Sequence, residues 1–170
     1  MTTPPEHNLM AITLRLIRPQ DIEYFSKWWR DPDLIKVTSG DTTELSDAQI
    51  SEYFGHIIKP HEALHYMVDL NNKTIGHISL QKREGPWWET QIVLGDKASR
   101  GKGYGVQAIH QLLDKAMVQG IDHIYLEVRP ENTRAIKTYQ KVGFSQVGGV
   151  IETGNKLQPQ LIRMELLQNT

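Results

Sequence analysis

Apolar side chains recur along this chain with two different periods. In some segments every second residue is apolar, as in a strand with one buried face, and in others the spacing is three or four, as in an amphipathic helix. Alternation predicts strands over residues 12–17, 64–70, 74–81, 87–94, 121–128 and 160–167, with a further short strand that opens at residue 144. Helical spacing predicts helices over residues 22–30, 47–58, 103–119 and 133–142.

The order of these elements predicts one mixed layer fold. Three hairpin-connected strands lie in the first half of the chain, and a single strand–helix–strand unit follows them. This order is typical of an α/β (α+β) domain with a mostly antiparallel central sheet of about seven strands and helices on both faces. Two polar stretches, residues 33–45 and 148–159, are predicted to be irregular.

Length and composition narrow the class of protein. The 170 residues suit a single domain over 1–170, of which residues 1–10 form a loose tail. The chain has no cysteine, which excludes disulfides and a cysteine nucleophile. Its net charge of −1 argues against a nucleic-acid partner. Because no apolar run approaches a membrane span and no signal-peptide pattern is present, we expect no membrane partner and a cytoplasmic location.

Charge is distributed unevenly between the two halves of the chain. Residues 21–52 contain eight acidic and three basic residues, whereas residues 97–141 contain eight basic and four acidic residues. A basic half suits an anionic cofactor, and an acidic half suits a cationic acceptor. Many of these charges are also explained as solvated helix faces.

A glycine-rich stretch, Ser99–Gly105, separates a predicted strand from the central helix. The first N–H groups of a helix have no partner within it, and the helix dipole makes this end a phosphate-binding site. No hydroxyl follows the lysine, as a Walker loop requires, and the glycine spacing is not that of a dinucleotide fingerprint. The stretch offers glycine backbone for close approach and two positive side chains, from Gly101, Gly103 and Gly105 and from Arg100 and Lys102.

Two patterns carry a resemblance to a known family. Arg-x-x-Gly-x-Gly at residues 100–105 resembles the pyrophosphate loop of the GNAT acetyltransferases, and Asn-x-x-Ala-x-x-x-Tyr-x-Lys-x-Gly-Phe at residues 132–144 resembles their second signature. The resemblance implies a GNAT-like sheet that is splayed at the acetyl-CoA strand, with acetyl-CoA as co-substrate. The seven histidines show no metal-binding spacing, so no metal is expected. Three subgroups look closest: ribosomal-protein N-terminal, polyamine and aminoglycoside 6′-N-acetyltransferases.

The resemblance also implies roles for individual residues. The strand before the glycine loop would bind the pantetheine arm through its backbone, and one N–H there would polarise the thioester carbonyl. Tyr139 matches the family tyrosine that donates a proton to the leaving thiolate, although a helix-face tyrosine can also be a core residue. The expected coenzyme contacts are Ile92, Val93 and Leu94 on the strand, Arg100, Gly101, Lys102, Gly103, Tyr104 and Gly105 in the loop, and Asn132 and Ala135 on the next helix.

The general base is less well defined by the sequence. Glu89 lies where related enzymes often carry a carboxylate, but it is also explained by a surface ion pair. A longer loop after the strand would shift the register and place Thr90 there instead. Asp69, His65 and His77 on neighbouring strands are further candidates.

The acceptor is expected to be a cationic amine, namely a protein N-terminus, a polyamine or an aminoglycoside. Acidic residues of 21–52 and the aromatic residues Trp28, Trp87 and Trp88 are expected to line its pocket. The alternative function is a non-catalytic acyl-CoA-binding or regulatory module with the same fold. The oligomeric state is not decided by the sequence, and a homodimer is one of the states left open.

Overall fold

The computed structural model describes residues 12–59 and 62–166, so the expected tail at residues 1–10 lies outside the described residues. Within them, one sheet of seven strands has the order β1-β2-β3-β4-β5-β7-β6. Only β4 and β5 are parallel, and the other neighbouring pairs are antiparallel. The expected mixed, mostly antiparallel sheet is therefore confirmed. The strands are β1 (Ile12–Leu16), β2 (Ala63–Leu70), β3 (Lys73–Lys82), β4 (Trp87–Leu94), β5 (His123–Val128), β6 (Phe144–Glu152) and β7 (Gln160–Leu166).

Five α-helices accompany these strands in the described part of the chain: α1 (Ile22–Trp28), α2 (Pro32–Val37), α3 (Asp47–Ile58), α4 (Tyr104–Val118) and α5 (Thr133–Val142). The sequence prediction missed α2, which lies in a stretch expected to be irregular. Asp31 caps this helix by accepting a hydrogen bond from the Asp33 amide at 2.9 Å, and Pro32 occupies its first turn. With one buried side chain, Leu34, the helix is too short to show an apolar period.

The last hairpin also differs from the prediction. Strand β6 continues to Glu152, into the stretch expected to be a loop. Its pairing with β7 shifts register between Val147 and Ile151, where Gly148 has a positive φ of 72°. Because β6 is exposed along nearly all of its length, it has no alternation of apolar and polar residues that would identify it.

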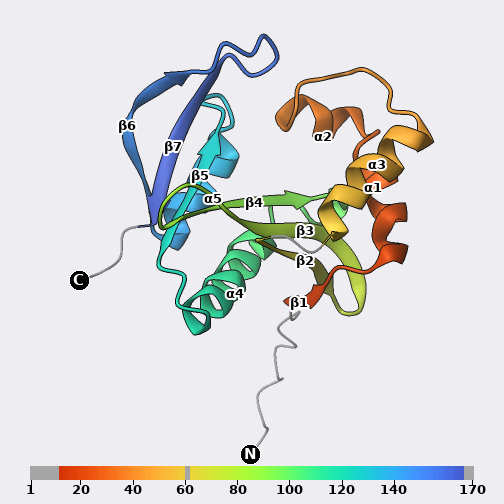
Figure 1. Ribbon diagram of the computed structural model, residues 1–170, viewed down its shortest axis with the longest axis horizontal. Helices are drawn as coiled ribbons and strands as arrows, with labels where there is room; N and C mark the ends of the chain where they lie inside the picture. The colour runs from red at the N-terminus through yellow and green to blue at the C-terminus, as the bar shows by residue number, and fades with distance from the viewer. Residues whose placement is uncertain (1–11, 60–61, 167–170) are drawn as a thin grey trace, which may run out of the picture.

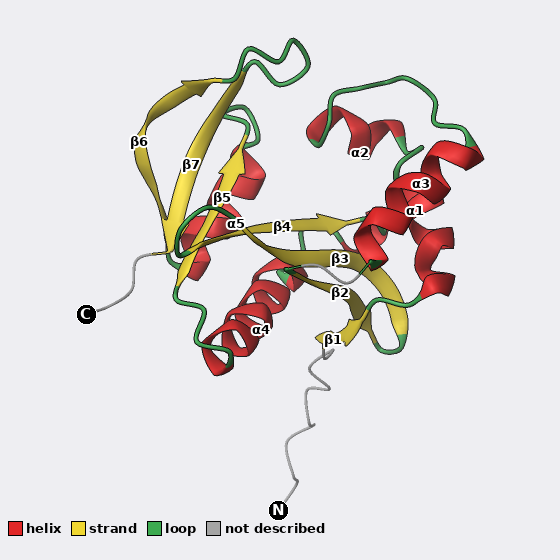
Figure 2. Ribbon diagram, viewed as in Figure 1, coloured by secondary structure: helices red, strands yellow, loops and turns green. Residues whose placement is uncertain are grey.

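Two hydrophobic cores lie on opposite faces of the sheet. Figure 2 shows the helices placed around the strands. The larger core joins α4 and α5 to one face and includes Ile109 and Leu112. The smaller core joins α1, α2 and α3 to the other face, where Phe25 and Phe54 pack on Met67 of β2. Figure 1 shows α4 on one side of β2–β4 and the group of α1 and α3 at the far end from β6 and β7.

The parallel strands β4 and β5 separate after a short contact. They pair at three positions, of which Glu89 opposite Tyr125 is the last. Residues 90–94 of β4 extend beyond this point without a partner on β5 among the described residues, while β5 continues along β7. The sheet is therefore splayed at β4, as expected, and the edge of β4 is open at its carboxyl end.

Candidate active site

The glycine loop presents an uncapped helix end beside the open edge of β4. Gly103 is the N-cap of α4, with φ of 83°, and there is no side-chain capping hydrogen bond. Gly101 also has a positive φ, 74°, a conformation that L-residues rarely adopt. A helix that begins at a glycine without a capping side chain suits the anion site that the glycine pattern predicts.

The charged side chains of the loop take different directions from those expected. Arg100 does not extend as a free cation: its Nε donates to the Leu94 carbonyl at 2.8 Å and its Nη2 donates to the Gly95 carbonyl at 2.9 Å. It also lies 3.5 Å from Asp31 at the start of α2. Arg100 therefore holds the end of β4 in shape, whereas Lys102 is exposed.

Gly105 lies where the glycine loop meets the carboxyl end of β4. A Cβ on Gly105 would lie 3.8 Å from Leu94 Cδ1 and 4.0 Å from Ile92 Cδ1. It would also lie 3.7 Å from Thr138 Cγ2 on α5. The structure thus brings together the N-terminus of α4, the unpaired end of β4 and one face of α5, which are the three elements that the sequence assigned to the coenzyme.

Helix α5 contributes the remaining coenzyme candidates. Asn132 caps it by accepting a hydrogen bond from the Ala135 amide at 3.2 Å, so the nitrogen end of its side-chain amide is the one that can contact a ligand. Ala135 is half-buried against the larger core. Tyr139, one turn further, is 8% exposed, and burial raises the pKa of its hydroxyl to about 12. It therefore stays protonated at neutral pH and can act as a proton donor.

Side chains of β4 alternate between the two faces of the sheet. Ile92 and Leu94 pack toward α4 and α5, and Val93 packs toward α1. By the same alternation, Glu89 points to the face of α1–α3. Its carboxylate is 13% exposed, pairs with Arg83 at 2.6 Å and accepts a hydrogen bond from Gln91 at 3.2 Å. As a base, Glu89 would act from within this ion pair.

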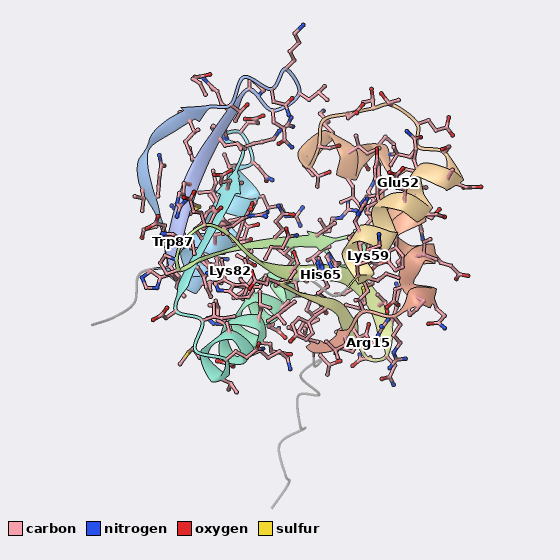
Figure 3. All side chains as sticks on the ribbon, viewed as in Figure 1. Arg15, Glu52, Lys59, His65, Lys82 and Trp87 are labelled. Carbon is pink, nitrogen blue, oxygen red and sulfur yellow. The ribbon has the colours of Figure 1, made fainter. Side chains whose placement is uncertain are left out.

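The other candidate bases, His65, His77 and Asp69, are engaged by neighbouring side chains. His65 Nδ1 and His77 Nε2 are 3.1 Å apart, and the His77 ring packs at 5.0 Å against that of Phe25. Burial, with a smaller contribution from His65, lowers the pKa of His77 to about 3. Asp69 is bound by Arg15 at 2.9 Å and by Thr74 at 2.7 Å. Figure 3 shows His65 in the middle of the sheet, away from Trp87 at the start of β4.

A hollow of about 400 Å³ opens on the α1–α3 face where β4 begins. Trp87 and Tyr125 line it, and the Arg163 guanidinium stacks at 4.6 Å and 3.7 Å from their ring centres. The other two tryptophans expected in an acceptor pocket lie elsewhere. Trp28 is 6% exposed in the smaller core, and Trp88 packs against the larger one.

Two residues in this region, Arg134 and Arg129, were missed by the sequence analysis as site residues, and a third, Thr90, was named there only as an alternative position for the base. A Cβ on Gly101 would lie 2.6 Å from Arg134 Nη2, which places this cation at the phosphate loop. Arg129, at the end of β5, donates to the Lys36 carbonyl at 2.8 Å and to the Leu157 carbonyl. It thereby connects α2 to the turn between β6 and β7. Thr90 is buried on β4, two residues before Ile92.

Two further features are absent from the described residues, namely a metal-binding group and a membrane-spanning helix. In residues 12–59 and 62–166 no three histidine, aspartate or glutamate side chains gather as a metal-binding group. No helix in that part of the chain is long and apolar enough to cross a membrane.

Comparison with known proteins gives a consistent result. The profile for the acetyltransferase (GNAT) domain matches residues 11–145. The chain is 24% identical over 155 residues to aminoglycoside N(6′)-acetyltransferase type 1 of Klebsiella pneumoniae, covering 82% of this chain and 77% of that protein. It is 33% identical over 96 residues to the N-alpha-acetyltransferase RimI of Mycobacterium tuberculosis, covering 54% and 58%.

Solved structures show the same fold. Spermidine N-acetyltransferase from Vibrio cholerae, in complex with CoA and spermine, superposes with a TM-score of 0.79 at 23% identity, covering 92% of this chain and 95% of that one. AAC(6′)-Ib in complex with ribostamycin and coenzyme A superposes with a TM-score of 0.78 at 20% identity, covering 91% and 92%. Both similarities extend over the sheet and the helices described above.

Proposed function

Since the chain belongs to the GNAT acetyltransferase family, we propose that it transfers an acetyl group from acetyl-CoA to a cationic amine by direct attack in a ternary complex. The observation that carries the proposal is the open edge of β4 beside the uncapped N-terminus of α4. These two features supply backbone groups for an extended amide chain and for a diphosphate at adjacent positions.

The residues present fit the coenzyme. The backbone of Ile92, Val93 and Leu94 would hold the pantetheine arm as an added strand, and the N–H groups after Gly103 would hold the pyrophosphate. Arg134 and Lys102 would add positive charge at the loop, while Arg100 keeps the loop in place through the Leu94 and Gly95 carbonyls. When bound, acetyl-CoA supplies the activated acetyl group.

The amine would approach from the opposite face of the sheet. Because α4 and α5 occupy one face and α1–α3 the other, the coenzyme groups on α4 and α5 leave the second face of β4 and β5 for the acceptor. Glu89 on β4 and the exposed Glu127 on β5 belong to this face by strand alternation. Their carboxylates would attract a cationic amine.

During the transfer the ammonium nitrogen would lose two protons, the departing thiolate would gain one, and the other would be released to solvent; the second nitrogen proton would replace the one that Tyr139 gives up. Glu89 would accept the proton of the ammonium group, directly or through water, and Arg83 would orient the carboxylate. Tyr139, whose pKa of about 12 keeps it protonated, would donate the proton that the departing thiolate requires. A backbone N–H of β4 would stabilise negative charge on the acyl oxygen.

Two observations support a cationic amine as the acceptor: the carboxylates on the second face of the sheet, and the acceptors for which similar proteins are named. Proteins named for aminoglycoside, spermidine and N-alpha-acetylation are all among the similar proteins, and each of these acceptors is a cationic amine. A mass-spectrometric panel of aminoglycosides, polyamines and peptides with free N-termini, with acetyl-CoA as donor, tests the proposal. Acetylation of one class supports it. Binding of acetyl-CoA without transfer to any amine would favour the alternative, a non-catalytic acyl-CoA-binding module.

A further inference from the structure

The hydroxyl of Thr90 is a buried polar group without a hydrogen-bond partner in the described structure. The residue is 3% exposed. Buried hydroxyls are nearly always paired, because an unpaired one loses its bonds to water and gains nothing in return. A valine would fill almost the same space without this cost, so the free protein alone gives no reason for a hydroxyl here.

Thr90 lies at the closed end of the cleft between β4 and β5. It is the first residue of β4 after the last pair with β5, Glu89 opposite Tyr125. On its other side it faces Leu80 of β3 in the register of the sheet. Strand alternation puts it on the same face as Ile92 and Leu94, the two side chains that lead to Gly105.

This position corresponds to the reactive end of the coenzyme rather than to its phosphates. At roughly 3.3 Å per residue, Thr90 lies about 13 Å along β4 from Leu94, on the side away from the glycine loop. A chain that is anchored at Gly103 and extends along β4 would bring its acyl end toward Thr90. That end carries two kinds of carbonyl oxygen, the thioester oxygen and the nearest pantetheine amide oxygen, and a threonine hydroxyl can donate to either.

We infer that Thr90 is a binding residue whose hydroxyl donates a hydrogen bond to a carbonyl oxygen at the acyl end of bound acetyl-CoA. The inference rests on the proposed function. It assigns the unpaired hydroxyl a partner that is present only in the complex. It also gives the face of β4 opposite Glu89 a polar contact, so that the two sides of the strand would hold the two reactants.

The test compares Thr90→Val and Thr90→Ser with the wild-type protein by calorimetric titration and thermal unfolding. Thr90→Val should leave the melting temperature of the free protein unchanged or raise it, because it removes an unpaired hydroxyl. The same variant should bind acetyl-CoA roughly tenfold more weakly and show a smaller rise in melting temperature on adding acetyl-CoA. Thr90→Ser should retain tight binding. Ser79→Ala, at a buried hydroxyl on the α1–α3 face of β3, should leave the acetyl-CoA-induced rise unchanged.

Titration with CoA distinguishes the two carbonyl sources. A defect seen with acetyl-CoA but not with CoA assigns the hydrogen bond to the thioester oxygen, and an equal defect with both assigns it to pantetheine. If the wild-type protein binds acetyl-CoA and Thr90→Val binds it with the same affinity, the inference is overturned while the proposed function stands. A large loss of stability, or failure to fold, in free Thr90→Val would also overturn it, because the hydroxyl would then have an internal partner. A wild-type protein that binds no acetyl-CoA would contradict the proposed function itself.

Discussion

At the scale of single residues, burial decides which titratable groups can take part in chemistry. The Tyr139 hydroxyl, the proposed proton donor, is neutral at pH 7 as any phenol is, and burial raises its pKa to about 12 and so keeps it neutral well above that pH. His77, whose side chain is half-buried, remains neutral at pH 7 because burial lowers its pKa to about 3. The same physical cause thus preserves a proton on the tyrosine and removes one from the histidine. Only the tyrosine belongs to α5, the helix proposed to flank the coenzyme.

Tyr139→Phe tests the proton-donor role. The substitution removes only the hydroxyl, so acetyl-CoA binding should persist while kcat falls by about 10²–10⁴-fold. Steady-state kinetics with the best amine, together with titration of acetyl-CoA, separates these quantities. An unchanged kcat across the pH range would show that Tyr139 is a core residue.

Gly103→Glu tests the phosphate loop, with Gly103→Ala as its matched control. Both substitutions strain a residue with φ of 83°, where the space around a Cβ is open, but only glutamate adds negative charge. Gly103→Ala should cost about 1 kcal/mol of stability and weaken acetyl-CoA binding moderately. Gly103→Glu should bind so weakly that calorimetry detects no heat. Equal affinities of the two variants would rule out a phosphate beside Gly103.

The lowered pKa of His77 predicts a pH-dependent stability. Because the unfolded state binds a proton near pH 6.5 and the folded state only near pH 3, stability is complete above pH 6.5 and declines as the pH falls toward 3. The decline from this group is at most about 1.4 kcal/mol per pH unit. Urea unfolding between pH 4 and 7 measures it. His77→Gln should flatten the dependence, whereas the exposed His123→Gln should not. An unchanged slope in His77→Gln would mean that His65 or the carboxylates are responsible.

At the scale of elements, the parts with strong periodicity were predictable and the parts defined by long-range contacts were not. The alternation in β2, β3 and β4 and the helical spacing in α4 identified the sheet and its central helix. The short α2 depends on a cap and one buried leucine, and its ends are fixed by residues far along the chain: Arg100 meets Asp31, and Arg129 holds the Lys36 carbonyl. The exposed β6 is defined by its pairing with β7. Similarly, the motif located the glycine loop but not the inward direction of Arg100, which depends on carbonyls of β4.

Helix α1 and the end of β4 meet at Gly95, which gives a prediction at this scale. A Cβ on Gly95 would lie 2.0 Å from the Trp28 ring, so Gly95→Ala must displace either the helix or the coenzyme strand. We expect it to destabilise the fold by about 3 kcal/mol and to weaken acetyl-CoA binding. Gly55→Ala, in α3 with open space around its Cβ, should instead stabilise by about 0.5–1 kcal/mol. Urea unfolding of both variants checks the contrast, and similar stabilities would contradict the packing of Trp28 on Gly95.

At the scale of the whole molecule, the acidic character of residues 21–52 is smaller than the sequence alone indicates. Four of the eight acidic side chains are in ion pairs: Asp21 with Arg15, Asp31 with Arg100, Asp33 with Lys97 and Asp47 with Arg30. Two of these pairs connect α2 to the basic segment that follows β4. The opposite charges of the two halves therefore partly serve to hold α2 against the glycine loop. Under the proposed function, the remaining acidic side chains would attract the acceptor.

Because the acidic charge is reduced, we expect salt to have a measurable but moderate effect on KM for the acceptor. Attraction of a cationic amine by exposed carboxylates is screened by salt, so KM for the best acceptor should rise by roughly two- to fivefold from low to high ionic strength. Replacing two exposed carboxylates of the loop before α3, by Asp41→Asn together with Glu44→Gln, should raise KM at low salt and weaken its salt dependence. Asp114→Asn, an exposed carboxylate on α4 at the other face of the sheet, is the matched control and should leave both quantities unchanged. A KM that does not rise with salt, or a preference for anionic acceptors, would show that shape and hydrogen bonding, rather than charge, select the amine.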